Sequence, residues 1–335
     1  MRFLTALACL GLGRYRLDGS TRMRARPIGA LVAALTDLGA QIAYESADGC
    51  PPLTILARGL TGGAVVFREP PSSQYLSALL MVAPHARQDV MIRVDGELPS
   101  EPYVDMTLDV MRSLGVEAVT TPDTHRWIVP AWQRYRAGEH SIEPDASAAT
   151  YFWAAAAITG GRMRIAGLTR ASRQGDTRFV DVLAQMGCAV QEDATSLTVA
   201  APAGGRLTGI TVDLNAMPDT VQTLAVVALF ADGPTRIDNV ANLRIKETDR
   251  LAALEAELTR LGARVETRPD GLTVYPPQTL RPAEINTYDD HRMAMSFAIA
   301  GLRAPGIVIR DAACVTKSFP GFFDVLNTLT CGTGL

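Results

Sequence analysis

The stretch Asn242-Leu243-Arg244-Ile245-Lys246-Glu247-Thr248-Asp249-Arg250-Leu251 leads into a strongly patterned segment of the chain. The leucines that follow recur at helical spacing, at Leu251, Leu254, Leu258 and Leu261. Gly262 then ends the pattern, as glycine does at many helix C-termini. The segment predicts an amphipathic helix, and we expect Thr248 to be its N-cap.

Lys246 and Arg250 would share a face at the start of this helix, where two cations are unfavourable. Like charges four residues apart repel by roughly 0.2–0.5 kcal/mol, and a helix N-terminus disfavours positive charge. A bound anion would reverse that sign. The alternative is a solvated helix start whose cations are neutralised by Glu247 and Asp249.

The end of this helix belongs to a repeat that runs through the chain. An apolar-Gly-small pattern recurs about every 72–76 residues, at Leu38-Gly39-Ala40, Leu114-Gly115-Val116, Met186-Gly187-Cys188 and Leu261-Gly262-Ala263. Alternating segments typical of strands follow each copy, such as Leu272-Thr273-Val274-Tyr275. Repetition at this period indicates a modular fold.

A second helix pattern is interleaved at the same period. Its copies begin at Pro71-Ser72-Ser73-Gln74, Pro144-Asp145-Ala146-Ser147, Pro218-Asp219-Thr220 and Tyr288-Asp289-Asp290-His291-Arg292. A strand pattern such as Val90–Val94 comes next, and then a polar loop. The segment from Met1 to Leu7 matches the interior of this helix, so we expect the chain to begin inside a helix rather than in a signal peptide.

The repeating unit is therefore helix, strand, polar loop, helix, strand, turn, strand. This order predicts an α/β (α+β) repeat architecture in which helices cover sheets. The polar loops collect arginine, lysine, serine and tyrosine, for example in Ser20–Arg26 and Val240–Glu247. Loops of this kind on a rigid scaffold predict a site for a multiply charged anion.

Composition restricts the class of protein. The 335 residues are 47% hydrophobic and 20% charged, and the net charge is −3. This balance is ordinary for a globular protein and gives no general surface for nucleic acid. The five cysteines are scattered without metal-ligand spacing, which fits free thiols in a cytoplasmic protein. The longest apolar run, from Tyr151 to Ile158, is too short to span a membrane.

Six motifs occur together in one order and resemble those of the 5-enolpyruvylshikimate-3-phosphate synthase family. They are Arg24-Ala25-Arg26-Pro27-Ile28, Ser72-Ser73-Gln74-Tyr75, Asp145-Ala146-Ser147, Leu243 to Arg250, Asp289 to Met295, and Lys317-Ser318-Phe319-Pro320. The resemblance covers the chain from Met1 to about Leu329.

The resemblance implies a two-domain enolpyruvyl transferase fold, an inside-out α/β barrel built from βαβαββ units. The first domain would comprise residues 1–142 and the second residues 143–335, with substrates bound in the cleft between them. The implied reaction transfers the enolpyruvyl group of phosphoenolpyruvate to the 5-hydroxyl of shikimate 3-phosphate, in the cytoplasmic pathway to chorismate.

The resemblance also implies two sets of substrate contacts. Those for shikimate 3-phosphate are Ser72, Ser73, Gln74, Ser100, Tyr103, Asp219, Asn242 and Lys246. Those for phosphoenolpyruvate are Arg26, Gln74, Arg250, His291, Arg292 and Lys317. Taken singly, Asp219 is also explained as an N-cap, His291 as a structural histidine and Arg26 as a surface cation.

The chemistry explains these residue types. One group must take a proton from the 5-hydroxyl, and another must give a proton to the methylene carbon of phosphoenolpyruvate. Asp219 and Glu247 are the carboxylates expected to do so. Arginine and lysine would offset the charge of the phosphates and carboxylates. The scheme needs no metal and no organic cofactor.

The chain departs from the family pattern at its start. An early Lys-Ser-x-x-x-Arg motif is absent, and only Met1-Arg2 remains of an Asn-Ala-Gly-Thr-x-x-Arg motif. We therefore expect an incomplete first domain. Three explanations stay open: a misplaced start, a natural short form with some activity, and a non-catalytic form that binds shikimate 3-phosphate or needs a complementary fragment. We expect a monomer, with self-association through the incomplete domain as the alternative.

The nearest other enzyme is the enolpyruvyl transferase that acts on UDP-N-acetylglucosamine. It uses a reactive cysteine in a mobile loop, and only Cys314, close to Lys317, has a comparable position. The Lys-Glu-Thr-Asp-Arg and Ser-Ser-Gln motifs favour the shikimate enzyme. If the chain is active, we expect weak inhibition by glyphosate, which occupies the phosphoenolpyruvate site in this family.

Overall fold

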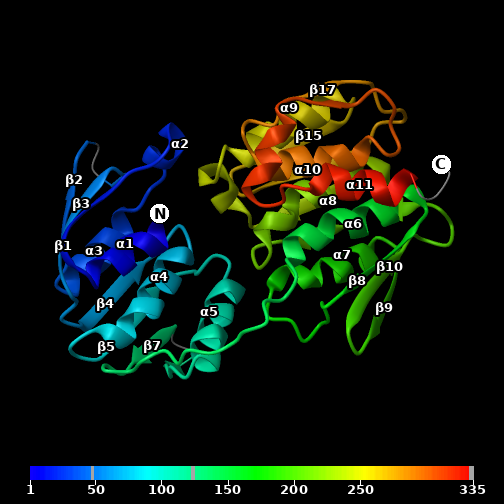
Figure 1. The fold of residues 1–335 in the computed structure, drawn as a ribbon. Coiled ribbons are helices and arrows are strands. Elements are labelled where there is room, and N and C mark those ends of the chain that lie inside the picture. The colour runs from blue at the N-terminus through cyan, green and yellow to red at the C-terminus, as the bar shows by residue number, and fades with distance from the viewer. Residues whose placement is uncertain (47–48, 122–124, 332–335) are drawn as a thin grey trace. The chain divides into compact units, whose positions relative to one another are not determined.

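The computed structural model describes residues 1–46, 49–121 and 125–331, without the side chain of Cys331. The described residues form two compact units, Met1–Ser141 and Ile142–Leu335 (Figure 1). Each unit has its own hydrophobic core. No described helix is both long and apolar enough to cross a membrane.

The glycine-terminated helices form where the repeat predicts them. They are α3 (Gly29–Asp37), α5 (Pro102–Ser113), α7 (Phe179–Gln185) and α9 (Arg250–Arg260), and α11 (Phe322–Cys331) occupies the same place in the last repeat. Four glycines follow them with positive φ, Gly39 at 95°, Gly115 at 82°, Gly187 at 102° and Gly262 at 97°. The recurring glycine is therefore a backbone requirement, because a side chain at such φ is strained.

The interleaved helices also match their prediction. They are α1 (Arg2–Cys9), α4 (Gln74–Val82), α6 (Ala146–Thr159), α8 (Val221–Val227) and α10 (His291–Ala300). Asp145 and Asp290 cap α6 and α10 by accepting hydrogen bonds from the backbone N–H groups of Ala148 and Arg292. The expected N-cap of α9 is wrong by one residue, since Asp249 rather than Thr248 accepts from the N–H of Ala252. Lys246 and Glu247 consequently precede the helix.

The strands divide between the two units. In the first unit they are β1 (Leu12–Leu17), β2 (Gln41–Tyr44), β3 (Leu53–Arg58), β4 (Gly63–Arg68), β5 (Val90–Asp95), β6 (Val119–Thr121) and β7 (Arg126–Val129). The second unit contains β8 (Arg162–Ala166), β9 (Ala189–Asp193), β10 (Ser196–Ala200), β11 (Leu207–Thr208), β12 (Thr211–Asp213), β13 (Ala231–Asp232), β14 (Thr235–Asp238), β15 (Arg264–Arg268), β16 (Gly271–Tyr275), β17 (Glu284–Ile285) and β18 (Val308–Ile309).

Two sheets show the complete unit, in the orders β4-β5-β7-β6 and β12-β14-β16-β15. In each, the first pair is parallel and joined through a helix, and the other pairs are antiparallel. The sheets β1-β3-β2 and β8-β10-β9 have the same antiparallel order without the leading strand. The predicted α/β repeat of βαβαββ units is thus confirmed.

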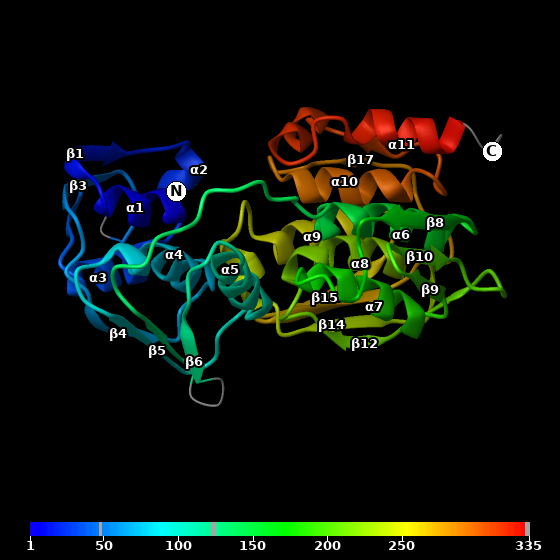
Figure 2. The same ribbon diagram turned by 60° about the horizontal axis from the view of Figure 1, so that its bottom comes forward.

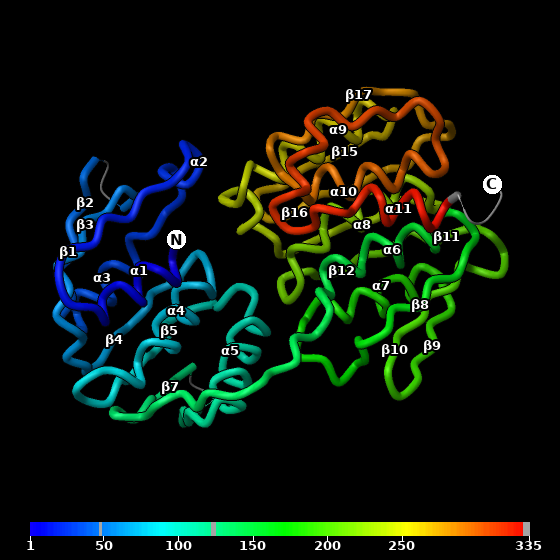
Figure 3. Tube along the Cα trace, viewed as in Figure 1, coloured from blue at the N-terminus to red at the C-terminus, as the bar shows by residue number. Residues whose placement is uncertain are grey.

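Helices α6, α8 and α10 pack against one another in the core of the second unit (Figure 2). The chain passes through them in turn, from green α6 to orange α10 in the trace (Figure 3). Buried hydroxyls join them: Thr150 and Thr223 lie 3.4 Å apart, and Thr223 and Ser296 lie 3.3 Å apart. Neighbouring members are separated by 73 residues, so each repeat contributes one hydroxyl from the same helix position.

The glycine stops can be tested at Gly262. An added Cβ would meet only ordinary contacts, the nearest at 3.5 Å, so the cost of Gly262→Ala is the strain of its positive φ, about 1–2 kcal/mol of unfolding free energy. Urea unfolding measures it. Gly204→Ala is the control, because Gly204 lacks a positive φ and has nothing within 4 Å of its added Cβ. Equal stability of the two variants would contradict the assignment.

Candidate active site

Arg250 is the centre of a charged cluster in the second unit. It is the first residue of α9, and its side chain is 1% exposed. Its Nη1 donates to Asp219 Oδ1 at 2.9 Å, and its Nη2 donates to Glu247 Oε2 at 2.9 Å. Its Nε donates to Asp290 Oδ2 at 2.7 Å. Three carboxylates from three chain segments thus converge on one buried guanidinium, as charge-assisted hydrogen bonds require.

Asp219 is held by cations on several sides. It lies in the short 3-10 turn Pro218–Thr220 that leads into α8. Arg292 Nη2 donates to its Oδ2 at 2.9 Å, and Lys246 Nζ lies 3.5 Å from its Oδ1. Burial by itself would raise the pKa of Asp219, but Arg292, Lys246 and Arg250 hold the pKa well below its ordinary value. Asp219 is therefore an ionised carboxylate.

Glu247 connects the first turn of α9 with a distant segment. Its Oε2 faces Arg250, and its Oε1 accepts a hydrogen bond from Lys317 Nζ. Lys317 ends the 3-10 helix Ala312–Lys317 and is half exposed. The carboxylate of Glu247 is thus shared between a buried cation and an accessible one.

The segment before α10 presents Asp290 and His291 from a strained backbone. Tyr288 and Asp289 both have a φ of 55°, a region that costs non-glycine residues energy and often marks a functional site. Asp290 is fully buried and lies between Arg250 and His291. Burial lowers the pKa of His291 to about 4, and Arg292 acts in the same direction, so the imidazole is neutral at physiological pH.

The cluster contains more positive than negative groups. Its cations are Lys246, Arg250, Arg292 and Lys317, and its carboxylates are Asp219, Glu247 and Asp290. Burial also lowers the pKa of Lys246, although Asp219 opposes that effect. An incoming anion would restore neutrality in a place with little water, where such interactions are strong.

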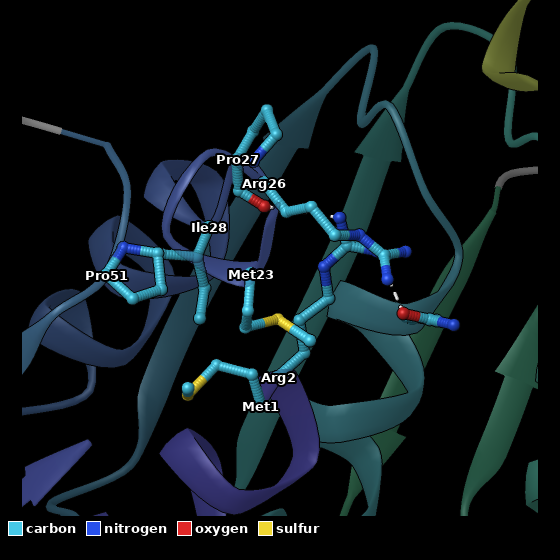
Figure 4. Close-up of a pocket in the computed structure, with 8 residues that line it drawn as sticks. Met1, Arg2, Met23, Arg26, Pro27, Ile28 and Pro51 are labelled. Atoms are coloured by element: carbon cyan, nitrogen blue, oxygen red, sulfur yellow. Dashed lines mark hydrogen bonds between the residues drawn. The ribbon is translucent and has the colours of Figure 1, made fainter. Parts of the chain in front are cut away.

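A second group of predicted residues lies in the first unit. Arg26 and Gln74 line a small hollow together with Met1, Arg2, Met23, Pro27, Ile28 and Pro51 (Figure 4). Ser72 Oγ accepts from the backbone N–H of Gln74 at 3.3 Å, and buried Ser73 is the N-cap residue of α4. The helix start therefore gathers the predicted Ser-Ser-Gln residues beside Arg26.

The other predicted residues lie at the start of α5 and in the segment before α9. Ser100 is buried with a φ of 59° and precedes Tyr103 in the first turn of α5, a helix that packs against α4. Asn242 lies in the 3-10 helix Ala241–Ile245, just before Lys246.

Sequence reasoning missed two buried groups. Asp290 is not among the predicted site residues, and its hydrogen bond with Arg250 could be suspected only from its place in the Asp-Asp-His-Arg motif. Asp176 is 3% exposed and accepts from Ser147 Oγ. Burial, with Asp219 nearby, raises the pKa of Asp176 to about 6. The only signal for Asp176 was its position in the polar loop before α7.

The described residues contain four free thiols and no grouped metal ligands. In residues 1–46, 49–121 and 125–331 there is no group of three or more histidine, cysteine, aspartate or glutamate side chains arranged to hold a metal ion. Cys9, Cys50, Cys188 and Cys314 are free thiols, and the side chain of Cys331 lies outside the described part. Burial raises the pKa of Cys314, whereas a nucleophilic cysteine needs a lowered pKa.

Comparisons with known proteins agree with one another. Residues 1–326 match the family model described as EPSP synthase (3-phosphoshikimate 1-carboxyvinyltransferase). A 3-phosphoshikimate 1-carboxyvinyltransferase of Trichormus variabilis is 49% identical over 96% of this chain and 75% of its own length. One from Marinomonas sp. is 46% identical over 98% and 77%. The structure of EPSP synthase from Acinetobacter baumannii superposes with a TM-score of 0.78 at 24% identity, over 98% of this chain and 76% of that one.

Asp290 tests the convergence on Arg250. Asp290→Ala leaves a buried guanidinium short of one carboxylate, which should lower the unfolding free energy by about 3–5 kcal/mol. Asp232→Ala is the control, since Asp232 is 58% exposed and pairs with Arg206 at 3.3 Å, an arrangement that contributes about 1 kcal/mol at most. Urea unfolding of both variants measures the difference, and equal losses would refute the central role of the cluster.

The low pKa of His291 predicts a pH dependence. Above the ordinary value of 6.5 the imidazole is neutral in both folded and unfolded chains. As the pH falls from 6.5 towards about 4, this histidine becomes protonated in the unfolded chain but stays neutral in the folded chain. Protonation therefore stabilises the unfolded chain, and the unfolding free energy decreases. His291→Gln should flatten this part of the profile.

Two comparisons isolate the effect of His291. His140→Gln, at an exposed histidine, should keep the slope of the unaltered chain. Asp176 acts in the opposite direction below its pKa of about 6, but it is present in every variant and cancels in the difference. An unchanged slope in His291→Gln would disprove the assignment.

Proposed function

The chain belongs to the EPSP synthase (3-phosphoshikimate 1-carboxyvinyltransferase) family, and from this premise we propose how its residues carry out the reaction. The reaction transfers the enolpyruvyl group of phosphoenolpyruvate to the 5-hydroxyl of shikimate 3-phosphate and releases phosphate, a step of aromatic amino acid biosynthesis. The observation that carries the assignment is the family match over residues 1–326.

We assign phosphoenolpyruvate to three arginines, one lysine and two neutral side chains. Its proposed contacts are Arg26, Gln74, Arg250, His291, Arg292 and Lys317. Half-exposed Lys317 can reach a phosphate oxygen by exchanging its bond to Glu247. Arg250 donates four hydrogen bonds to carboxylates, and among the described residues none accepts from the second hydrogen of its Nη1. That hydrogen is available to the substrate.

We assign shikimate 3-phosphate to polar side chains and one lysine. Its proposed contacts are Ser72, Ser73, Gln74, Ser100, Tyr103, Asp219, Asn242 and Lys246. Hydroxyls and amides of this kind bind phosphate and sugar oxygens with directional hydrogen bonds. One chain carries all of these residues, and the proposed form is a monomer. In the part of the chain that the structure describes, four cysteines are free thiols, which supports a cytoplasmic location.

Asp219 and Glu247 are the proposed proton carriers. Asp219 is ionised, because its cations hold the pKa low, and it can take the proton of the 5-hydroxyl as oxygen attacks the central carbon of phosphoenolpyruvate. Glu247 would give a proton to the methylene carbon, which produces a tetrahedral intermediate. Phosphate then leaves this intermediate as one of the two carboxylates takes back a methyl proton, and the double bond of the enolpyruvyl group is restored. The Oε1 of Glu247 accepts a hydrogen bond from Lys317, and transfer of Lys317 to the substrate phosphate would free that oxygen to carry the proton.

The reaction is tested by phosphate release from phosphoenolpyruvate and shikimate 3-phosphate. Asp219→Asn and Glu247→Gln should each lower kcat by about 10²–10⁴-fold, the usual contribution of a general acid or base. Exposed Asp232→Asn should leave kcat unchanged. UDP-N-acetylglucosamine in place of shikimate 3-phosphate should give no release. Absence of release by the unaltered chain, or full activity of Asp219→Asn, would overturn the assignment.

A further inference from the structure

Arg2 is absent from the proposed substrate contacts, yet it organises the group in the first unit. It begins α1, and its side chain is 8% exposed. Its Nη1 donates to Gln74 Oε1 at 2.8 Å and to Ser72 Oγ at 3.1 Å. The hydrogen bond to Gln74 is drawn as a dashed line in the close-up of the hollow (Figure 4).

The contact with Arg2 decides which way the Gln74 amide faces. A guanidinium has five N–H donors and no acceptor, so it can hydrogen-bond only the oxygen of an amide. The Nε2 group of Gln74, which carries both amide hydrogens, must therefore turn away from Arg2. Since Gln74 lines the hollow, this orientation offers donors rather than an acceptor to a ligand.

The same guanidinium sets the role of Ser72. The hydroxyl oxygen of Ser72 accepts from Arg2 Nη1 at 3.1 Å and from the backbone N–H of Gln74 at 3.3 Å. These two bonds occupy both lone pairs of the oxygen. The hydroxyl hydrogen then remains for donation to an acceptor, such as a phosphate oxygen.

Arg2 also holds the segment that carries Arg26. The carbonyl of Pro27 accepts from Arg2 Nη2 at 3.2 Å and from the hydroxyl of Tyr75 at 2.7 Å. The guanidinium carbon of Arg2 lies 4.7 Å from the centre of the Tyr75 ring, a favourable cation–π distance. The backbone next to Arg26 is thus fixed against α4.

We propose that Arg2 is a positioning residue that makes Gln74 and Ser72 hydrogen-bond donors and holds Arg26 beside them, so that all three face substrate oxygens. This role rests on the proposed function, because the oxygens are those of the two anionic substrates. The competing explanation is that Arg2 only packs α1 against Tyr75 and stabilises the first unit.

Arg2→Lys separates the two explanations. Lysine keeps the charge but has no planar fork that can bind three partners. kcat/KM should fall by about tenfold to a hundredfold, the scale of lost hydrogen bonds to a charged group, mainly through a higher KM. The melting temperature should stay within a few degrees of the unaltered chain. Arg112→Lys, at an exposed arginine of the same unit, should change neither quantity.

A double-mutant cycle with Gln74 tests whether Arg2 acts through that side chain. In the Gln74→Ala background, Arg2→Lys should cost much less than it does alone, because residues acting as a unit are not additive. Additive losses would overturn the proposal. Gln74→Glu covers the case in which Arg2→Lys does not fold. Glutamate keeps an acceptor for Arg2 but has no donor for the substrate, so kcat/KM should fall as much as is expected for Arg2→Lys. An unchanged kcat/KM would refute the orientation of the Gln74 amide.

An NMR measurement does not depend on catalysis. The side-chain amide signals of Gln74, assigned by their loss in Gln74→Ala, should be sharp in the unaltered chain and broadened or shifted in Arg2→Lys but not in Arg112→Lys. Unchanged signals in Arg2→Lys would disprove the positioning role. If the unaltered chain releases no phosphate while the Gln74 signals respond to Arg2→Lys, the proposed function fails and the positioning of Gln74 stands.

Discussion

The second unit depends on the burial of one guanidinium, that of Arg250. A buried cation is tolerated only when carboxylates surround it, and Asp219, Glu247 and Asp290 do so. These residues lie far apart in the chain, so a single electrostatic requirement brings three segments together. Two of the three are also the proposed proton carriers. Stability and chemistry therefore draw on the same groups, and a change in protonation at the site also changes what neutralises Arg250.

The repeat explains how the segments reach this point. Gly39, Gly115, Gly187 and Gly262 end one helix in each repeat at an equivalent place, and the following hairpin returns the chain to the next interleaved helix. The carboxylates stand where such helices begin, Asp219 before α8 and Asp290 before α10. The start of α4 presents Ser72 and Gln74 in the same way. A regular scaffold thus supplies the helix starts, and the side chains at those starts supply the chemistry.

The sequence was sufficient to predict the repeat, because glycine stops and helix periodicity are local signals. It also predicted that Lys246, Glu247 and Arg250 belong to a charged site. It did not reveal that Arg250 is enclosed, since its partner Asp290 is 40 residues away. The role of Arg2 was hidden for the same reason, because Ser72 and Gln74 lie 70 and 72 residues further along. The N-cap of α9 was misplaced because Thr248 and Asp249 are both good caps.

The hydroxyl contacts of Thr150, Thr223 and Ser296 have a consequence for how the repeats can diverge. Each hydroxyl is buried between helices and has another repeat's hydroxyl as its neighbour. Thr150 also donates to the carbonyl of Ser147 at 2.7 Å, so it keeps a partner if Thr223 is replaced. Ser296 would lose its neighbouring hydroxyl if Thr223 became apolar, and a polar group buried without a partner is costly. Thr223 and Ser296 should therefore change together, while Thr150 can change more freely. The repeats can differ in their loops, but this buried pair keeps two helix positions alike.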